Sequence, residues 1–209
     1  MTYFPFYCDI EQKKWLLVGG GRVAAGKFSR LIAFTEKITV IAPDISSEIR
    51  ENAPSGVLFL ERDFEEADLG RADIVVAATG DKQLNAWIAS ACRSRGIPVN
   101  AVDDPDNCDF IFPAIIKRGR LTVSVSTDGA SPVYAAAVKK EISNLVPEDI
   151  DLILEKMAAL RKTVPERFPS FTQHERGMLY RKALNQLLDD SGAEVDIDSL
   201  AEEISRGRE

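Results

Sequence analysis

The chain of 209 residues carries a net charge of −7, and 45% of its residues are hydrophobic. This length and composition predict a globular protein with one full α/β core and a smaller appendage, and the acidic balance argues against nonspecific nucleic-acid binding. No apolar run is long enough to span a membrane and the opening residues lack the basic region of a signal peptide, so we expect a cytoplasmic protein.

The first predicted strand, residues 15–18, runs directly into three glycines. Gly19 and Gly21 occupy the first two positions of the G-x-G-x-x-G/A dinucleotide fingerprint, and Ala24 occupies the third. In this pattern one glycine allows a tight turn and the next lets the backbone approach a pyrophosphate. The third small residue lets the following helix pack on the strand.

A helix is predicted after the glycines, because Ala24, Phe28 and Leu31 recur at i, i+4 and i+7. Its first amides, with Arg22 and Val23 in that turn, should point at the phosphates with the positive end of the helix dipole behind them. The alternative is a glycine-rich turn that binds no ligand. The strand, the spacing and the helix together favour a nucleotide.

The second strand, residues 38–41, is followed by Ala42 and Pro43, and Asp44 comes slightly later than the usual ribose-binding acid. No arginine or lysine lies between Ala42 and Glu48 to hold a 2′-phosphate. The sequence therefore predicts NAD rather than NADP as the cofactor, with Pro43 and Asp44 in its binding site.

Apolar runs alternate with helical patterns through the first half of the chain. These runs cover residues 15–18, 38–41, 57–60, 74–78 and 99–102. The alternation predicts an α/β fold with a Rossmann-type doubly wound parallel sheet. Nucleotide sites in such sheets lie at the carboxyl ends of the strands, where Thr79, Gly80, Asn100 and Asp103 are expected.

Asp103 and Asp104 offer adjacent carboxylates at the end of the fifth strand. Hydride transfer to NAD needs orientation of the reactants and a group that takes up any proton released, so either aspartate is a candidate base. The alternative is that Asp-Asp-Pro is a turn whose aspartates cap backbone amides. The position at the mouth of the sheet favours a functional role.

The pattern changes after Pro113. Residues 115–117 and 121–126 predict a hairpin, and Ser131-Pro132 predicts the start of a helix that carries Tyr134, Val138 and Ile142 on one stripe. These elements are too small to close a core alone, so we expect them to form the interface of a homodimer. We predict three parts: a NAD-binding Rossmann domain (1–113), a dimerisation region (114–147) and a helical C-terminal domain (148–209).

Hydroxyl side chains, including those of Ser126 and Thr127, precede the predicted helix start at Ser131 and resemble a second anion site. Five basic residues lie between positions 114 and 140 against the single acid Asp128. They are Lys117, Arg118, Arg120, Lys139 and Lys140. This local surplus suits a polycarboxylate substrate, and the alternative is a solvated face. We name Asn100, Ser126, Thr127 and Lys139 as candidate substrate-binding residues.

No metal site is predicted. The lone His174 has no cysteine or histidine nearby in the sequence. Cys8, Cys92 and Cys108 are an odd number without C-x-x-C spacing, so neither a disulfide framework nor a zinc site is indicated and we expect buried thiols.

These motifs together resemble a specific family: the precorrin-2 dehydrogenases and sirohydrochlorin ferrochelatases, including the amino-terminal module of siroheme synthases. The resemblance covers most of the chain. Its blocks are Pro5-Phe6, residues 18–24 with Lys27, 77–81 with Leu84-Asn85, 99–103, 108–114 and 126–132. The chain departs from the family where it has Gly26 before the lysine and Ala136 in the helix of the second half, since basic residues are frequent at both places.

The resemblance implies NAD-dependent removal of two hydrogens from the tetrapyrrole precorrin-2 to give sirohydrochlorin, on the route to siroheme or cobalamin. It maps the family's catalytic aspartate onto Asp103. It also implies a homodimer of Rossmann, dimerisation and helical parts. Some members insert iron or cobalt as well, and the residues do not separate these from pure dehydrogenases. The alternatives are a NAD-binding redox or metabolite sensor, and a chelatase or tetrapyrrole carrier without hydride chemistry.

Overall fold

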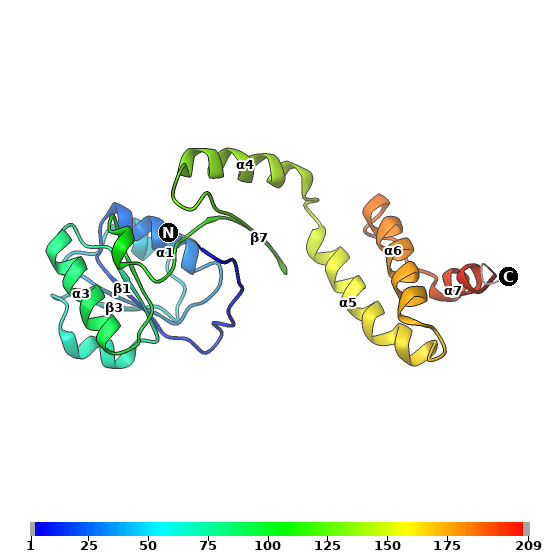
Figure 1. Ribbon diagram of the computed structural model, residues 1–209, viewed down its shortest axis with the longest axis horizontal. Coiled ribbons are helices and arrows are strands. Elements are labelled where there is room, and N and C mark those ends of the chain that lie inside the picture. The colour runs from blue at the N-terminus through cyan, green and yellow to red at the C-terminus, as the bar shows by residue number, and fades with distance from the viewer. Residues whose placement is uncertain (1–2, 207–209) are drawn as a thin grey trace. The chain divides into compact units, whose positions relative to one another are not determined.

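The computed structural model describes residues 3–206 and divides into two compact units, Met1–Pro113 and Ala114–Glu209. Figure 1 labels several of the helices and strands.

The first unit is built on a five-stranded, wholly parallel sheet with the strand order β3-β2-β1-β4-β5. The strands are β1 (Trp15–Val18), β2 (Ile38–Ile41), β3 (Leu58–Leu60), β4 (Ile74–Ala77) and β5 (Val99–Ala101). The chain moves outward from β1 to β3 and then crosses back to β4 on the other side of β1. This topology confirms the predicted Rossmann-type doubly wound sheet.

Helices cover both faces of this sheet. They are α1 (Arg22–Leu31), α2 (Ser47–Glu51), α3 (Lys82–Ser94) and the 3-10 helices η1 (Glu66–Arg71) and η2 (Pro105–Asn107). Alternate residues of each strand face opposite cores: Leu17 packs with Phe28 of α1 in one, and Leu16 packs with Ile88 of α3 in the other. Because both faces are covered, the strands read as continuous apolar runs.

Two expectations about the first unit need correction. The third, fourth and fifth strands are each one residue shorter than predicted. The cysteines are not all buried: Cys92 is buried and Cys108 is half-buried, whereas Cys8 is exposed. Burial raises the pKa of the Cys92 thiol to about 11, so this thiol stays protonated as a small apolar residue of the core. Cys8 differs because it precedes the first strand and lies outside the sheet.

The second unit begins with an antiparallel hairpin of β6 (Ala114–Arg118) and β7 (Leu121–Val125), followed by α4 (Pro132–Leu145). Gly119 turns the hairpin with φ +50°, and a Cβ there would collide with the Asp151 side chain. The Asp151 carboxylate accepts a hydrogen bond from the Arg120 amide at 2.7 Å. This contact ties the hairpin turn to the next helix.

Three further helices complete the second unit: α5 (Ile150–Arg167), α6 (Gln173–Asp189) and α7 (Ile197–Arg206). Leu179, Ala183 and Leu187 form a fully buried stripe on α6. A capping box between Thr172 and Glu175 starts this helix, because each side chain satisfies a backbone amide of the other. Within residues 3–206 no helix combines the length and the apolar character needed to span a membrane.

Candidate functional site

The loop after β1 forms a cradle whose first position requires a glycine. Gly19 adopts φ +125°, and a Cβ there would collide with the Ala78 carbonyl oxygen. The Gly19 amide donates to the Ile41 carbonyl at 2.8 Å, so the turn is fixed to the end of β2. A Cβ at Gly21, by contrast, would meet nothing within 4 Å. The open space beside Gly21 is where the fingerprint places a pyrophosphate.

The middle glycine, Gly20, is a residue that the sequence reasoning missed. A Cβ on Gly20 would collide with the Asp44 carbonyl oxygen, and the Gly20 carbonyl accepts a hydrogen bond from the Ser46 amide at 3.0 Å. The loop after β1 therefore lies backbone against backbone on the loop after β2. The run of three consecutive glycines was the available signal.

The start of α1 is left open for an anion. Gly21 is the N-cap residue and supplies no side-chain cap, and the first turn contains no acidic residue. Arg22 and Val23 are both exposed, so the first-turn amides face a surface that a ligand can reach. Together with the space at Gly21, these amides fit a dinucleotide pyrophosphate.

Pro43 and Asp44 follow β2 and are exposed at the carboxyl edge of the sheet. The first basic residue after them is Arg50, which is already engaged. Its Nε donates to the Ile45 carbonyl at 3.2 Å, and it forms an ion pair of 3.0 Å with Glu61. Arg50 is therefore occupied by local contacts.

The turn after β4 is held by a buried amide that the sequence reasoning did not single out for a role. Asn85 of α3 is 2% exposed; its Oδ1 accepts from the Thr79 hydroxyl at 2.7 Å and from the Thr79 amide at 3.1 Å. Asp81 caps α3 through the amides of Gln83 and Leu84. Gly80 stands exposed between these anchored residues, at the same edge of the sheet as the glycine cradle. Asn85 stands at helical spacing before Ile88 and Cys92, and this place on the apolar face of the helix was the available signal.

The two aspartates after β5 have different environments. Asp103 is exposed and adopts a left-handed φ of +58°, a conformation that costs free energy for a residue with a Cβ. Asp104 is half-buried, and its carboxylate accepts a hydrogen bond of 2.7 Å from Asn107 Nδ2. Asp104 therefore stabilises the η2 turn, and Asp103 presents its carboxylate to the surface.

The buried side chain of Asn100 anchors the loop that carries Asp103. Asn100 is 4% exposed, and its Nδ2 donates to the Phe110 carbonyl at 2.9 Å. The Cys108 sulfur lies 3.1 Å from the Ala101 carbonyl oxygen and 3.3 Å from that of Asp104. Burial raises the pKa of the Cys108 thiol, which keeps it a donor to these carbonyls. Asn100 thus anchors the loop from inside the protein.

The hydroxyls predicted as a second anion site cap their own turn in the second unit. Ser126 Oγ accepts from the Asp128 amide at 3.1 Å, and Thr127 Oγ1 accepts from the Ser131 amide at 3.0 Å. Asp128 adopts φ +50°. The turn leads into α4, on which Lys139 is half-buried. These candidates belong to the second unit, whereas Asp103 and the glycine cradle belong to the first.

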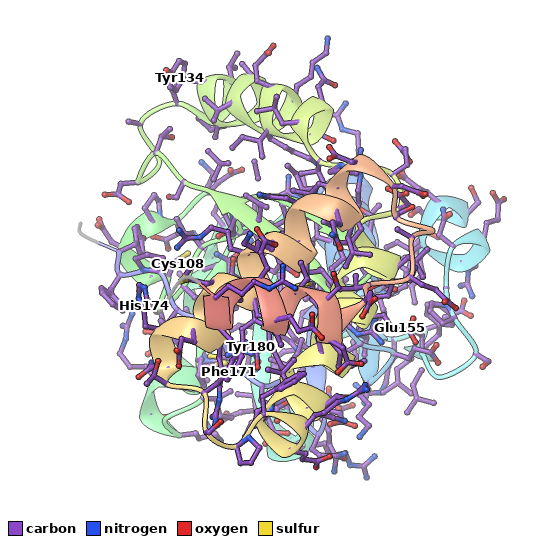
Figure 2. The ribbon with its side chains drawn as sticks, turned by 90° about the vertical axis from the view of Figure 1, so that its right-hand side faces the viewer. Cys108, Tyr134, Glu155, Phe171, His174 and Tyr180 are labelled. Carbon is purple, nitrogen blue, oxygen red and sulfur yellow. The ribbon has the colours of Figure 1, made fainter. Side chains whose placement is uncertain are left out.

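Part of the predicted basic surplus has a structural role. Arg118 donates to the Val146 carbonyl and, at 3.2 Å, to the Ser143 hydroxyl, and Arg120 contacts Asp151. Figure 2 labels His174, which is exposed near the start of α6. Among residues 3–206 no group of three or more histidine, cysteine, aspartate or glutamate side chains is arranged to hold a metal ion.

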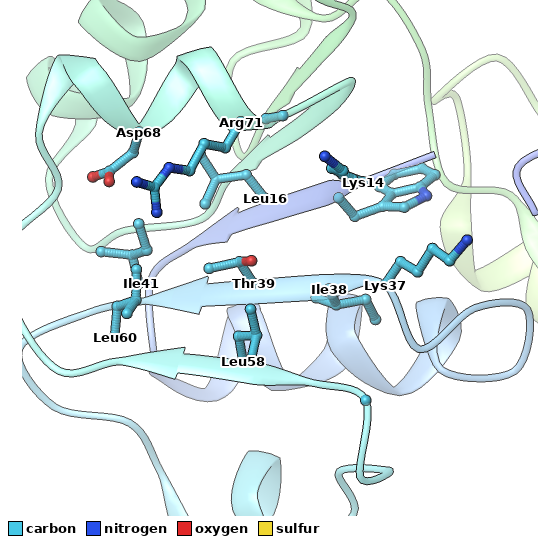
Figure 3. Close-up of a pocket in the computed structure, with 13 residues that line it drawn as sticks. Lys14, Leu16, Lys37, Ile38, Thr39, Ile41, Leu58, Leu60, Asp68 and Arg71 are labelled. Atoms are coloured by element: carbon cyan, nitrogen blue, oxygen red, sulfur yellow. The ribbon is translucent and has the colours of Figure 1, made fainter. Parts of the chain in front are cut away.

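A separate cavity of about 540 Å³ lies over the open part of the sheet above β2 and β3 (Figure 3). Leu16, Thr39 and Leu58 form its floor, and Lys14 and Lys37, which precede β1 and β2, lie near its rim. The cavity exists because the crossover from β3 to β4 contains the short η1 rather than a long helix. It therefore differs from the carboxyl edge that carries the glycine cradle and Asp103.

Two family descriptions match the chain. Residues 6–114, just over half of it, match the family described as "Putative NAD(P)-binding", and residues 118–145 match "Sirohaem biosynthesis protein central". The first unit is thus a NAD(P)-binding domain.

Curated relatives include siroheme synthase of Methylococcus capsulatus, 41% identical over 170 residues that make up 81% of this chain and 36% of that protein. Siroheme synthase 1 of Aeromonas salmonicida is 35% identical over 84% of this chain and 38% of its own length. The chain therefore spans little more than a third of these relatives.

A solved structure named SirC, precorrin-2 dehydrogenase, is 25% identical with a TM-score of 0.75, and the match covers 98% of this chain and 100% of that one. The fold of the chain therefore recurs in a known protein over nearly its whole length. The chain belongs to the family that the siroheme synthases share with the precorrin-2 dehydrogenases.

Proposed function

We propose that the protein is a NAD-dependent precorrin-2 dehydrogenase that forms sirohydrochlorin in siroheme or cobalamin biosynthesis. The observation that carries the proposal is the carboxylate of Asp103, held exposed in a strained backbone conformation at the sheet edge that also carries the glycine cradle. The match to SirC over nearly its full length supports the same reaction.

In the proposed mechanism the first unit binds the cofactor and removes the proton. Gly19, Gly21, Arg22 and Val23 would hold the pyrophosphate, and the loop residues Pro43, Asp44, Thr79 and Gly80 would hold the remainder of the dinucleotide. Bound NAD supplies the hydride acceptor. One C–H bond of precorrin-2 breaks with transfer of its electron pair and hydrogen as hydride, and Asp103 accepts the proton lost from the substrate.

The preference for NAD over NADP is part of the proposal. Asp44 is exposed where the adenosine ribose is expected, and the Arg50 guanidinium is engaged by Ile45 and Glu61 rather than free to bind a 2′-phosphate. Calorimetry should give a several-fold lower Kd for NAD, and tighter binding of NADP would contradict this assignment.

The second unit is proposed to contribute the dimer interface and substrate contacts in a cytoplasmic homodimer. Ser126 and Thr127, in the turn before α4, and the half-buried Lys139, within α4, are the proposed contacts. Asn100 is proposed to act by holding the Asp103 loop, because its side chain is buried.

The test is anaerobic incubation of the protein with precorrin-2 and NAD, followed by the absorbance of sirohydrochlorin and the appearance of NADH in equal amount. A dehydrogenase gives both products. A NAD-binding sensor would bind the cofactor and give neither product, and a tetrapyrrole carrier would bind precorrin-2 without consuming NAD.

A further inference from the structure

We propose that Lys27 binds a carboxylate of the substrate beside Asp103. The inference rests on the proposed function and adds a specificity-determining residue within the first unit. It concerns a residue that the candidate site described above does not use.

Lys27 is held on an aromatic platform. It lies on α1, and its Nζ is 4.5 Å from the centre of the Phe112 ring, within the range of a cation–π contact. Phe112 packs against Phe110, with ring centres 5.7 Å apart, and Asn100 Nδ2 donates to the Phe110 carbonyl. The buried side-chain amide of Asn100 therefore anchors both the loop of Asp103 and the phenylalanine rings beside the Lys27 ammonium group.

The ammonium of Lys27 is partly desolvated without a close counter-ion. Burial lowers its pKa, and Arg30 lowers it further, while the Asp103 carboxylate acts in the opposite direction and only partly offsets these effects. Among residues 3–206 no carboxylate lies within the 4.0 Å of an ion pair with Lys27. A desolvated cation is costly unless it is paired, so an anionic ligand would stabilise this arrangement.

The groups around Lys27 indicate which anion it meets. Besides Arg30 on α1 itself, the groups around Lys27 come from the segment after β5: the Phe112 ring lies against its ammonium group, and the Asp103 carboxylate acts on its charge. The proposed substrate carries several carboxylates, and one of them bound at Lys27 would lie next to the base that takes the proton. Gly26 at the preceding position carries no charge, so Lys27 is the α1 cation seated on Phe112, with Arg30 one turn further along the helix.

The experiment measures steady-state kinetics with precorrin-2 and the Kd for NAD in four variants. Lys27→Met removes the charge and keeps most of the side-chain volume. Lys27→Arg keeps the charge, and Lys13→Met is the matched control because Lys13 is exposed and precedes β1, at the opposite edge of the sheet. Thermal unfolding checks that each variant is folded, with Lys27→Gln as a second neutral variant.

We expect Lys27→Met to raise the KM for precorrin-2 by roughly 10- to 100-fold, the loss typical of a charge-assisted contact, with a smaller effect on kcat. NAD affinity should change less than about twofold, Lys27→Arg should restore most of the lost binding, and Lys13→Met should match the wild type. An unchanged KM in both neutral variants would overturn the inference.

A raised Kd for NAD with an unchanged KM would also overturn it, because Lys27 would then serve the cofactor. If wild type and Lys13→Met both fail to oxidise precorrin-2, the proposed function fails, and the inference that depends on it fails with it. The two failures are therefore distinguishable.

Discussion

The first unit and residues 114–145 of the second bury their apolar residues to very different extents. In the first unit all four residues of β1 are buried, with helices on both faces of the sheet. Across residues 114–145, all of which the structure describes, only Ile116 and Ala135 are buried, whereas Val133 is 81% exposed and Leu145 is 82% exposed. The first unit closes its own core, and this part of the second unit does not.

The difference follows from the number of strands. A five-stranded sheet has two faces wide enough for helices, whereas a two-stranded hairpin is marginal in water without a further partner. Tyr134 of α4 is 64% exposed and is labelled in Figure 2. The comparison suggests that cofactor binding and proton removal belong to the first unit and that assembly belongs to the second. Substitutions in one unit should therefore leave the role of the other unit unchanged.

The largest expected effect is catalytic and lies in the first unit. Asp103→Asn should lower turnover of precorrin-2 by roughly 100- to 10,000-fold, the range typical of a general base, because it deletes the basicity and keeps the side-chain shape. NAD affinity and assembly should be unchanged. Asp104→Asn is the control and should be much milder, since Asp104 bonds Asn107. If Asp104→Asn loses activity and Asp103→Asn does not, then Asp104 is the base and Asp103 is not.

The next effect concerns the glycine cradle. Gly21→Val should raise the Kd for NAD by about tenfold or more, because the side chain would fill the space that the pyrophosphate requires. The fold should persist, since a Cβ at Gly21 meets no protein atom within 4 Å. Calorimetry and thermal unfolding separate the two effects. Gly20→Ala should instead destabilise the fold and lower the Tm, because its Cβ would collide with the Asp44 carbonyl. Unchanged NAD affinity in Gly21→Val would show that the cradle is not used.

Assembly tests the other side of the comparison. Tyr134→Asp should shift a homodimer toward the 23.0 kDa monomer in light scattering while NAD affinity is retained, because the charge would be buried in the proposed interface. The variant chain should still fold, since an acidic residue suits the first turn of a helix. A wild-type protein that is monomeric at micromolar concentration would contradict the proposal that the second unit forms a dimer interface.

The smallest effect is on stability and has opposite signs in the two units. Gly26→Ala should raise the free energy of unfolding by about 0.5–1 kcal/mol, because Gly26 lies inside α1, and a Cβ there would meet nothing. Gly119→Ala should lower it, because Gly119 has φ +50° and its Cβ would collide with Asp151. Denaturant unfolding measures both changes, and destabilisation by Gly26→Ala would contradict the helix geometry.

Much of the first unit could be predicted because its signals are local. Buried strands read as apolar runs, and the turn at Gly19 needs a glycine for its backbone conformation. The features that were missed arise from residues far apart in the chain. Gly20 is restricted by Asp44, Lys27 is seated on Phe112, and no periodicity carries that information.

The basic surplus of the second unit was harder to interpret for the same reason. The charges of Arg118 and Arg120 are visible in the sequence, but their partners Ser143 and Asp151 lie 25 and 31 residues further on. Only the folded chain distinguishes a cation that holds the hairpin from one that can meet a substrate. The left-handed backbone of Asp103 is likewise a property of the folded loop.

The contact between Gly20 and Asp44 limits how cofactor preference can change. The loop after β1 and the loop after β2 contact each other through their main chains. Neither loop can therefore change its length without moving the other. An insertion between Pro43 and Ser46 would displace the glycines as well. A new specificity, in evolution or in engineering, is therefore expected to come from exchanging the exposed side chain at Asp44 and not from remodelling its backbone.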